Sequence, residues 1–178
     1  MEPKRAFKFC PKCGGKLSVP EGNKLSCIRC HYGLYINPLV TNGVIIENDG
    51  GEILLVKRAC DPHKGQWDVP GGFIQPRESF STSVKRELME ELHLEVLIDH
   101  IVGIYTDTYL FDGVINDTLC IMVSAHILSG TITPDDDAEA YEFFSRKEIL
   151  KQKIAFEGVK KGLIDHIRST TSFPNLTA

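Results

Sequence analysis

The sequence predicts an α/β fold in which a mixed sheet is flanked by a few helices, with a small separate module in front of it. Segments rich in Val, Ile and Thr alternate with helical patterns along most of the 178 residues, which is typical of a sheet covered by helices. Four of the six cysteines fall within residues 10–30, so the start of the chain is organised differently from the rest. A chain of this length holds one main domain with room for a small appendage.

The composition is that of an ordinary globular protein. Apolar residues make up 42% and charged residues 25%, which argues against long disorder or a fibrous fold. The net charge of −4 gives the chain as a whole no general attraction for nucleic acid or anionic membranes. No apolar run approaches the ~20 residues of a membrane helix. Because Met1–Arg5 is not followed by an apolar core, we expect no secretory signal and a cytoplasmic protein.

Two Cys-x-x-Cys pairs are separated by thirteen residues: Cys10, Cys13, Cys27 and Cys30. Four thiolates fill the tetrahedral shell of a structural zinc ion. Gly14-Gly15 follows the first pair, and Pro20–Asn23 predicts a turn between two short strands. A unit this small cannot bury a core, so the metal would supply its folding energy. We expect a zinc ribbon over residues 1–35, in preference to four unrelated thiols or two disulfides.

Basic residues gather in this predicted ribbon: Lys4, Arg5, Lys8, Lys12, Lys16, Lys24 and Arg29. A zinc ribbon with such a surface can bind nucleic acid or brace a neighbouring domain. Few aromatic residues stand between the basic ones, where they would be needed to stack on bases. A solvated basic surface is therefore the favoured interpretation, and we do not expect nucleic acid as a partner.

The main domain is predicted over residues 36–168, after a linker at Tyr35–Pro38. Strand patterns stand at residues 39–47, 52–58, 67–69, 95–104, 119–128 and 139–144. Asn48–Gly51 predicts a hairpin turn, and a further strand with the turn Asp112-Gly113 lies between the fourth and fifth of these segments. Helices are predicted at residues 79–92, 145–150 and 155–167. Residues 169–178 are expected to form a frayed tail.

The helix predicted at residues 79–92 carries the chemistry. At 100° per residue, an apolar stripe that should face the core runs along it: Phe80, Val84, Leu88 and Leu92. Three carboxylates share one side beside this stripe, not opposite it: Glu87, Glu90 and Glu91. Clustered carboxylates repel one another. Arg86 relieves part of this repulsion, and a divalent cation with oxygen ligands, such as magnesium, would relieve more. The alternative is a solvated or salt-bridged face.

A longer pattern contains this helix: Gly72, five residues, Glu78, seven residues, then Arg86-Glu87-Leu88-Met89-Glu90-Glu91-Leu92. This stretch resembles the Nudix box, and the resemblance extends over most of the chain. The box normally ends with a Gly where this chain has His93. That Gly ends the helix in a left-handed conformation, which His adopts at some cost. The resemblance implies an α/β/α sandwich and a metal-dependent hydrolase that cleaves a nucleoside diphosphate linked to another group.

The resemblance also assigns roles within the box. Glu87 and Glu91 would be the core ligands of Mg²⁺ or Mn²⁺, and Glu90 a further ligand. The backbone carbonyl near Gly72 would complete the shell. Glu78 and Arg86 would be structural, fixing the loop before the helix against it. Divalent ions of this kind neutralise the diphosphate and activate a bound water for in-line attack.

Family members often add an acidic residue from a downstream loop, as base or ligand. Four candidates precede the aromatic pair Phe143-Phe144: Asp135, Asp136, Asp137 and Glu139. Matching this pair to that of the family favours Asp137, with Glu139 next. A solvated acidic loop is the alternative. The general base therefore stays open between Glu87 and this loop.

Two features ahead of the box have open roles. Trp67 would either flank the nucleotide or pack in the core. Lys57-Arg58, at the end of a strand, would either bind phosphate or lie on the surface.

The leading functional prediction is a zinc-ribbon Nudix pyrophosphohydrolase acting on a nucleotide-containing small molecule. This arrangement resembles NADH pyrophosphatases and plant-type FAD pyrophosphatases. The NADH group carries a Ser-Gln-Pro-Trp signature after its box, and this chain has none. Short matches to the FAD group stand at Tyr35–Pro38 and Ile154–Phe156. We therefore expect FAD or ADP-ribose as substrate ahead of NADH.

Two other functions were weighed. A binding or regulatory protein on a Nudix fold would use the ribbon to contact nucleic acid. A Nudix site that no longer catalyses a reaction should lose its carboxylates, but this chain keeps them. An enzyme that decaps RNA ends would need a basic RNA-binding surface, which the net charge of −4 does not favour. The sequence does not give the oligomeric state. Dimers are common in the family, so the resemblance leaves a homodimer open.

Overall fold

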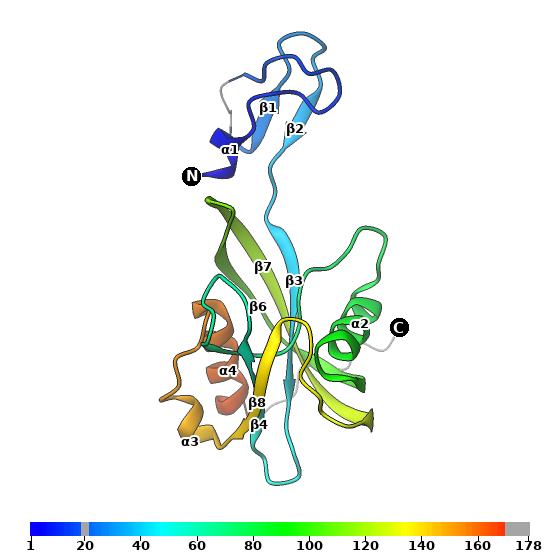
Figure 1. Cartoon of the computed structure of the whole chain (residues 1–178), viewed down its shortest axis with the longest axis vertical. Coiled ribbons are helices and arrows are strands. Elements are labelled where there is room, and N and C mark those ends of the chain that lie inside the picture. Colours follow the sequence, from blue (N-terminus) through cyan, green and yellow to red (C-terminus); the bar gives the residue numbers. More distant parts are fainter. Residues whose placement is uncertain (19–21, 170–178) are drawn as a thin grey trace. The chain divides into compact units, whose positions relative to one another are not determined.

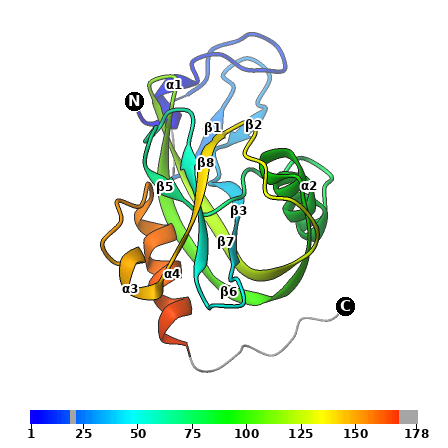
Figure 2. The same ribbon diagram turned by 60° about the horizontal axis from the view of Figure 1, so that its bottom comes forward.

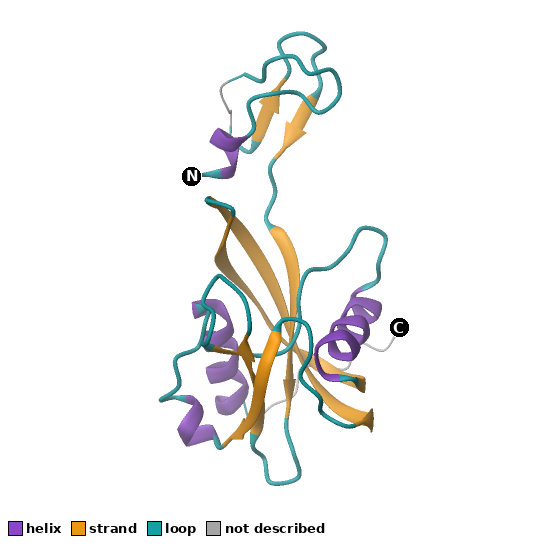
Figure 3. Ribbon diagram, viewed as in Figure 1, coloured by secondary structure: helices purple, strands orange, loops and turns teal. Residues whose placement is uncertain are grey.

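The computed structural model describes residues 1–18 and 22–169. Its elements, in chain order, are α1 (Pro3–Ala6), β1 (Lys24–Ser26), β2 (Gly33–Tyr35), β3 (Leu39–Ile46), β4 (Ile53–Arg58), β5 (Trp67–Asp68), α2 (Phe80–Leu92), β6 (Leu94–Phe111), β7 (Val114–Gly130), β8 (Ala138–Phe144), α3 (Arg146–Ile149) and α4 (Glu157–Arg168) (Figure 1 and Figure 3). The chain divides into two compact units: residues 1–39 with 108–118, and residues 40–107 with those from 119 onward.

The first unit contains the cysteines and a small antiparallel pair of strands, β1 and β2. Lys24 lies opposite Tyr35 in this pair. A second antiparallel pairing, the bridge between Leu17 and Cys27, links the segment after the first Cys-x-x-Cys to the second. This pairing agrees with the hairpin predicted between the two cysteine pairs. Part of the turn predicted at Pro20–Asn23 lies outside the described residues.

Apart from residues 108–118 of β6 and β7, the second unit contains two three-stranded sheets, with strand orders β3-β7-β6 and β5-β4-β8. β4 pairs antiparallel with both of its neighbours, and Ile53 lies opposite Phe144 of β8. In Figure 1 and Figure 2, α2 lies on one side of these strands and α3 and α4 lie on the other. This is the α/β/α sandwich with a mixed sheet that the sequence predicted.

The core has two layers because side chains along the central strands alternate between the two faces. Val44 and Ile46 of β3 belong to the layer under α2, whereas Ile45 between them belongs to the layer under α3 and α4. β4 alternates in the same way. The α2 layer is completed by Val84, Leu88 and Leu92, and the other layer by Ile149, Val159 and Leu163.

The long hairpin of β6 and β7 differs from the prediction. Strands predicted at residues 95–104 and 119–128, with a separate short one between them, are two continuous strands of 18 and 17 residues joined at Asp112-Gly113. Residues 105–118, predicted as a separate strand with a turn, instead continue both long strands, and half-buried residues alternate with exposed ones through most of this segment.

No helix in the described part of the chain is long and apolar enough to cross a membrane. The tail predicted at residues 169–178 lies outside the described residues, apart from Ser169.

Candidate active site

The helix α2 presents the acidic residues, and both of its ends are capped. The Ser79 hydroxyl accepts a hydrogen bond from the Thr82 backbone N–H (3.2 Å) at the start of the helix. The helix ends at His93, whose φ of 57° and ψ of 38° are left-handed. This is the conformation expected where the box normally has Gly. Val84, Leu88 and Leu92 are fully buried, so the apolar stripe fixes the direction in which the carboxylates point.

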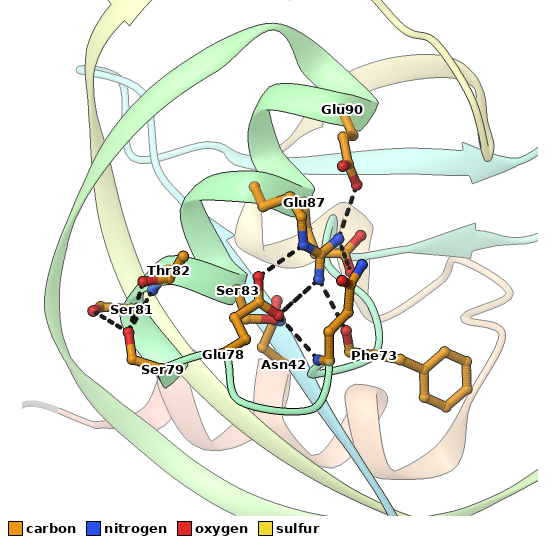
Figure 4. A network of polar contacts seen from close by, with 11 residues as sticks. Asn42, Phe73, Glu78, Ser79, Ser81, Thr82, Ser83, Glu87 and Glu90 are labelled. Carbon is orange, nitrogen blue, oxygen red and sulfur yellow. Dashed lines mark hydrogen bonds and ion pairs between the residues drawn. The ribbon is translucent and has the colours of Figure 1, made fainter.

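Arg86 is the centre of a network of charged groups (Figure 4). Its guanidinium donates two hydrogen bonds to the Glu78 carboxylate, of 2.8 and 3.0 Å, and one of 3.1 Å to the Phe73 carbonyl. Its Nη1 also donates to one oxygen each of Glu87 and Glu90, both at 2.8 Å. The hydrogen bonds from Arg86 lower the pKa of Glu78 to about 2. Arg86 therefore ties the loop before α2 to the helix, and it holds two of the acidic side chains.

Glu87 lies against the backbone of the loop at Gly72. A Cβ atom at position 72 would lie 2.7 Å from the carboxylate carbon and from both carboxylate oxygens of Glu87. Only a residue without a side chain leaves room for this approach. The Glu87 side chain is largely buried, and this burial raises the pKa of its carboxyl group.

Glu91 is buried, and its carboxylate Oε2 accepts a hydrogen bond of 3.0 Å from the Gly71 backbone N–H. The pKa of Glu91 is raised to about 8, chiefly by burial, while the Gly71 hydrogen bond opposes this effect. The negative charges of Glu87, Asp68 and Asp137 contribute to the same rise. A buried carboxylate among other carboxylates is costly unless a positive charge compensates it.

The two favoured downstream candidates, Asp137 and Glu139, lie in different surroundings. Asp137 accepts a hydrogen bond from the Cys60 thiol (3.2 Å), and its charge acts on Glu91. Glu139 faces Lys57 instead, in an exposed ion pair of 3.9 Å. Of the two, Asp137 is therefore the one whose charge raises the pKa of a carboxyl group on α2.

Trp67 and Arg58 both have structural partners. The Trp67 ring packs edge-on against Phe144, with centroids 4.9 Å apart. Arg58 donates to Asp68 (3.1 Å) and to the Pro62 carbonyl (2.8 Å), and its guanidinium lies over the Phe156 ring. These contacts favour a core role for Trp67 and a structural role for Arg58.

The sequence analysis missed three buried polar residues around the site: Asn42, Asp68 and Ser83. Burial raises the pKa of Asp68 to about 6, against the opposing effect of the Arg58 charge. Asn42 donates a hydrogen bond of 3.0 Å to Ser83. A signal for Asn42 was present, since it is a polar residue inside an otherwise apolar strand pattern.

The four cysteines form a second candidate centre, within the first unit. Their sulfur atoms all lie within 4.8 Å of one another. Among residues 1–18 and 22–169, they are the one group of three or more potential ligands gathered this closely. The arrangement fits the four-thiolate shell of a structural zinc ion. The α2 carboxylates are not gathered to that extent, and Arg86 lies between two of them.

The donors around α2 nevertheless fit a hard divalent cation. Glu87, Glu90 and Glu91 offer carboxylate oxygens, which are the ligands that magnesium and manganese prefer. The side chain of Glu91 is buried beside three other negative charges, and the glycine backbone at Gly72 leaves room at Glu87.

Comparison with known proteins agrees with this geometry. The sequence profile of the NUDIX domain matches residues 38–166. The chain is 33% identical over 129 residues to the ADP-ribose pyrophosphatase of Methanocaldococcus jannaschii, covering 72% of this chain and 73% of that one. A crystal structure of a NUDIX hydrolase from Nitrosomonas europaea superposes with a TM-score of 0.76, at 29% identity, and covers 92% of each chain.

A second group of relatives is longer than this chain. The NAD-capped RNA hydrolase NudC of Pseudomonas aeruginosa is 26% identical over 163 residues, which cover 90% of this chain and 55% of that one. The NudC of Haemophilus influenzae is 33% identical over 96 residues, or 36% of its length. The chain thus spans about half or less of these relatives.

These matches, for a chain in which the acidic helix α2 follows the loop Pro70-Gly71-Gly72 (the Pro-Gly-Gly loop), identify a hydrolase of the nucleotide pyrophosphatase class. The chain belongs to the Nudix hydrolase family.

Proposed function

We propose that this Nudix hydrolase cleaves the diphosphate of a nucleoside diphosphate linked to another group, with FAD or ADP-ribose as substrate ahead of NADH. The observation that carries the proposal is the buried Glu91 carboxylate, which faces the charges of Glu87, Asp68 and Asp137 with a backbone N–H as its hydrogen-bond donor. Such a group is well suited to hold a cation beside a diphosphate.

Glu87 and Glu91 are the proposed core ligands of Mg²⁺ or Mn²⁺, with Glu90 as a further ligand. The bound ion would neutralise phosphate charge and lower the pKa of a coordinated water. Arg86 engages one oxygen each of Glu87 and Glu90, so each carboxylate has a second oxygen to offer. Glu78 and Arg86 hold the loop before α2 against the helix.

The backbone of the Pro-Gly-Gly loop would supply a further oxygen. The Gly72 carbonyl accepts a hydrogen bond from the Asn42 backbone N–H (2.8 Å). The Gly71 N–H points to Glu91. Gly71 is therefore the better candidate for the loop carbonyl that completes the metal shell.

Two candidates stand for the general base, Glu87 and the downstream acidic loop. Within that loop we favour Asp137, because its charge acts on Glu91, whereas Glu139 is paired with Lys57. A general base must lie within reach of the attacking water. Because the charge of Asp137 acts on the proposed metal ligand Glu91, Asp137 lies near the place where a metal-bound water would stand.

The four cysteines would hold a structural Zn²⁺ in a ribbon over residues 1–35, followed by the hydrolase domain over residues 36–168. Each Cys-x-x-Cys pair has a sulfur in contact with the other pair, with Cys10–Cys30 at 3.8 Å and Cys13–Cys27 at 3.5 Å. The bound ion would supply folding energy to a unit with little core of its own.

The substrate ranking rests on sequence similarity as well as on motif. The relative from Methanocaldococcus jannaschii, similar over 72% of this chain, is an ADP-ribose pyrophosphatase. The absence of a Ser-Gln-Pro-Trp sequence after the box argues against NADH. A nucleotide-containing small molecule is thus the proposed partner, and the family resemblance leaves a homodimer to be tested by light scattering.

A second candidate function is hydrolysis at a capped RNA end. It is favoured by one observation, the similarity over 90% of this chain to a protein named NAD-capped RNA hydrolase. The basic residues of the first unit would then contact RNA. A non-catalytic binding protein is less well supported, because the three carboxylates of α2 are all retained.

Hydrolysis in ¹⁸O-labelled water tests the proposed reaction. Attack at one phosphorus of FAD or ADP-ribose should give two monophosphate products, with label in only one of them. Capped RNA and NADH are run beside these substrates. Turnover of capped RNA without turnover of the free dinucleotides would favour the second candidate function.

A further inference from the structure

Asn42 and Ser83 form a buried polar pair beneath the proposed metal site. Asn42 in β3 is 3% exposed and Ser83 in α2 is 0% exposed. The Asn42 side-chain Nδ2 donates a hydrogen bond of 3.0 Å to the Ser83 hydroxyl (Figure 4). The Asn42 Oδ1 atom is buried and has no hydrogen-bond partner within the described residues. Proteins pair nearly all of their buried polar atoms, so this exception calls for an explanation.

The backbone of β3 around Asn42 runs along the Pro-Gly-Gly loop. Asn42 N–H donates to the Gly72 carbonyl (2.8 Å), and Val44 N–H donates to the Pro70 carbonyl (2.9 Å). A Cβ atom at Gly71 would lie 2.7 Å from Asn42 Oδ1 and 2.5 Å from the Asn42 carbonyl oxygen. Asn42 therefore occupies the space where a side chain at position 71 would stand. Its side chain lies against Gly71, and its backbone N–H binds the Gly72 carbonyl.

The same loop contacts the proposed metal ligands from its other side. Gly71 N–H donates to Glu91, and the Gly72 backbone packs against the Glu87 carboxylate. Ser83 lies one helical turn before Glu87. Asn42 thus connects the loop and the helix at the point where both meet the carboxylates.

We propose that Asn42 is a positioning residue for the metal site, acting through the Pro-Gly-Gly loop and through Ser83. Its amide fixes the distance between the loop and α2, so Gly71 N–H and Glu91 stay aligned and the Glu87 carboxylate stays against Gly72. The carboxylates are then arranged for a cation before it binds, which reduces the cost of ordering them on binding. The unpaired Oδ1 lies where a Cβ at position 71 would stand, so the glycine is what leaves room for it. This inference rests on the proposed function of the α2 carboxylates.

The test is direct Mn²⁺ binding to the zinc-loaded protein, measured by electron paramagnetic resonance. Asn42→Ala should raise the dissociation constant for Mn²⁺ at least tenfold. Ser83→Ala should act in the same direction. It also removes the 3.4 Å hydrogen bond that Arg86 Nη2 donates to the Ser83 hydroxyl, so the loss of Mn²⁺ affinity in the double variant should be about that of Ser83→Ala alone and well below the sum of the two single losses. The Mg²⁺ concentration for half-maximal activity should rise in parallel, with kcat at saturating Mg²⁺ within about threefold of wild type.

Thr118→Ala is the matched control, since Thr118 is another buried polar strand residue and lies in the first unit. Its Mn²⁺ affinity should equal that of the wild type even where its thermal stability falls. Asn42→Ser serves if Asn42→Ala does not fold. Unchanged Mn²⁺ affinity in the folded Asn42 variants, or an equal loss in the control, would overturn the inference.

Glu91→Gln separates this inference from the proposed function. If wild type binds Mn²⁺ and Glu91→Gln does not, the proposed site stands, and the Asn42 variants alone decide the inference. If Glu91→Gln binds Mn²⁺ as wild type does, the proposed site is wrong and the inference fails with it.

Discussion

Gly72 and Glu87, fifteen residues apart in the sequence, are packed so closely that a single added carbon atom would collide with the carboxylate. A Cβ at position 72 would lie 2.7 Å from both oxygens of Glu87. The neighbour is the end of a side chain, so a larger residue at position 72 would displace the carboxylate and leave the backbone in place. The relationship explains in steric terms why the pattern needs a glycine here.

Gly72→Ala should therefore reduce activity far more than stability. We expect a loss of about 100-fold in turnover, because metal-borne stabilisation of charge is worth several kcal/mol and depends on the position of Glu87. The melting temperature should fall by only a few degrees. Steady-state kinetics and thermal unfolding, measured on the same samples, give the two quantities.

Gly50→Ala is the control for this experiment. Gly50 lies in the turn between β3 and β4, where an added Cβ would lie 3.2 Å from the Asn48 side-chain oxygen and 4.0 Å from the Glu52 side chain, far from the carboxylates of α2 in the sequence. It should keep wild-type turnover. Equal losses of turnover in both variants would contradict the steric argument.

Glu91→Gln should also lose about 100-fold or more in turnover, because the change keeps the shape of the side chain but removes a charged oxygen ligand. The fold should survive, since the Gln side-chain oxygen can still accept the Gly71 hydrogen bond. Glu142→Gln, on the exposed side of β8, is the matched control and should behave as wild type. Near-wild-type turnover of Glu91→Gln at saturating Mg²⁺ would rule out the assignment of Glu91 as a metal ligand.

Sequence reasoning predicted the helix α2 and its buried stripe because both depend on local periodicity. The left-handed His93 was also predictable, from its position after the last turn. The approach of Glu87 to Gly72 and the buried pair of Asn42 and Ser83 were not, because they join segments that only the fold brings together. The acidic loop stayed ambiguous for the same reason. Asp137 and Glu139 are two residues apart in sequence, yet they face different partners.

Purified protein should carry about one zinc ion per chain, in keeping with four clustered thiolates. Cys27→Ser should remove the zinc and unfold residues 1–35 while the hydrolase domain stays folded. Mass spectrometry of the metal content shows whether the zinc is lost, and limited proteolysis shows whether residues 1–35 unfold. Fluorescence of Trp67, the only tryptophan of the sequence, shows whether the hydrolase domain stays folded. Cys60→Ser, outside the cluster, should keep the zinc. A zinc-free wild-type protein in reducing buffer would contradict the ribbon assignment.

Glu78 should make the stability of the protein depend on acid pH. Hydrogen bonds from Arg86 lower the pKa of Glu78 from its ordinary 4.5 to about 2 in the folded state. Its contribution to the free energy of unfolding is therefore complete above pH 4.5 and is lost as the pH falls from 4.5 to 2. In urea unfolding followed by Trp67 fluorescence, Glu78→Gln should be less stable than wild type at pH 6, and the gap should narrow below pH 4.5. A gap that stays constant down to pH 2 would contradict this role.

The most direct measurement of the central claim is kcat/KM for FAD, ADP-ribose and NADH, compared on one preparation with and without Mg²⁺. We predict Mg²⁺-dependent release of AMP, with FAD or ADP-ribose preferred over NADH. A kcat/KM for NADH at least tenfold above those for both FAD and ADP-ribose, a difference of ~1.4 kcal/mol in transition-state binding, would contradict the substrate ranking. Absence of hydrolysis of all three in the presence of Mg²⁺ or Mn²⁺ would contradict the proposed function itself.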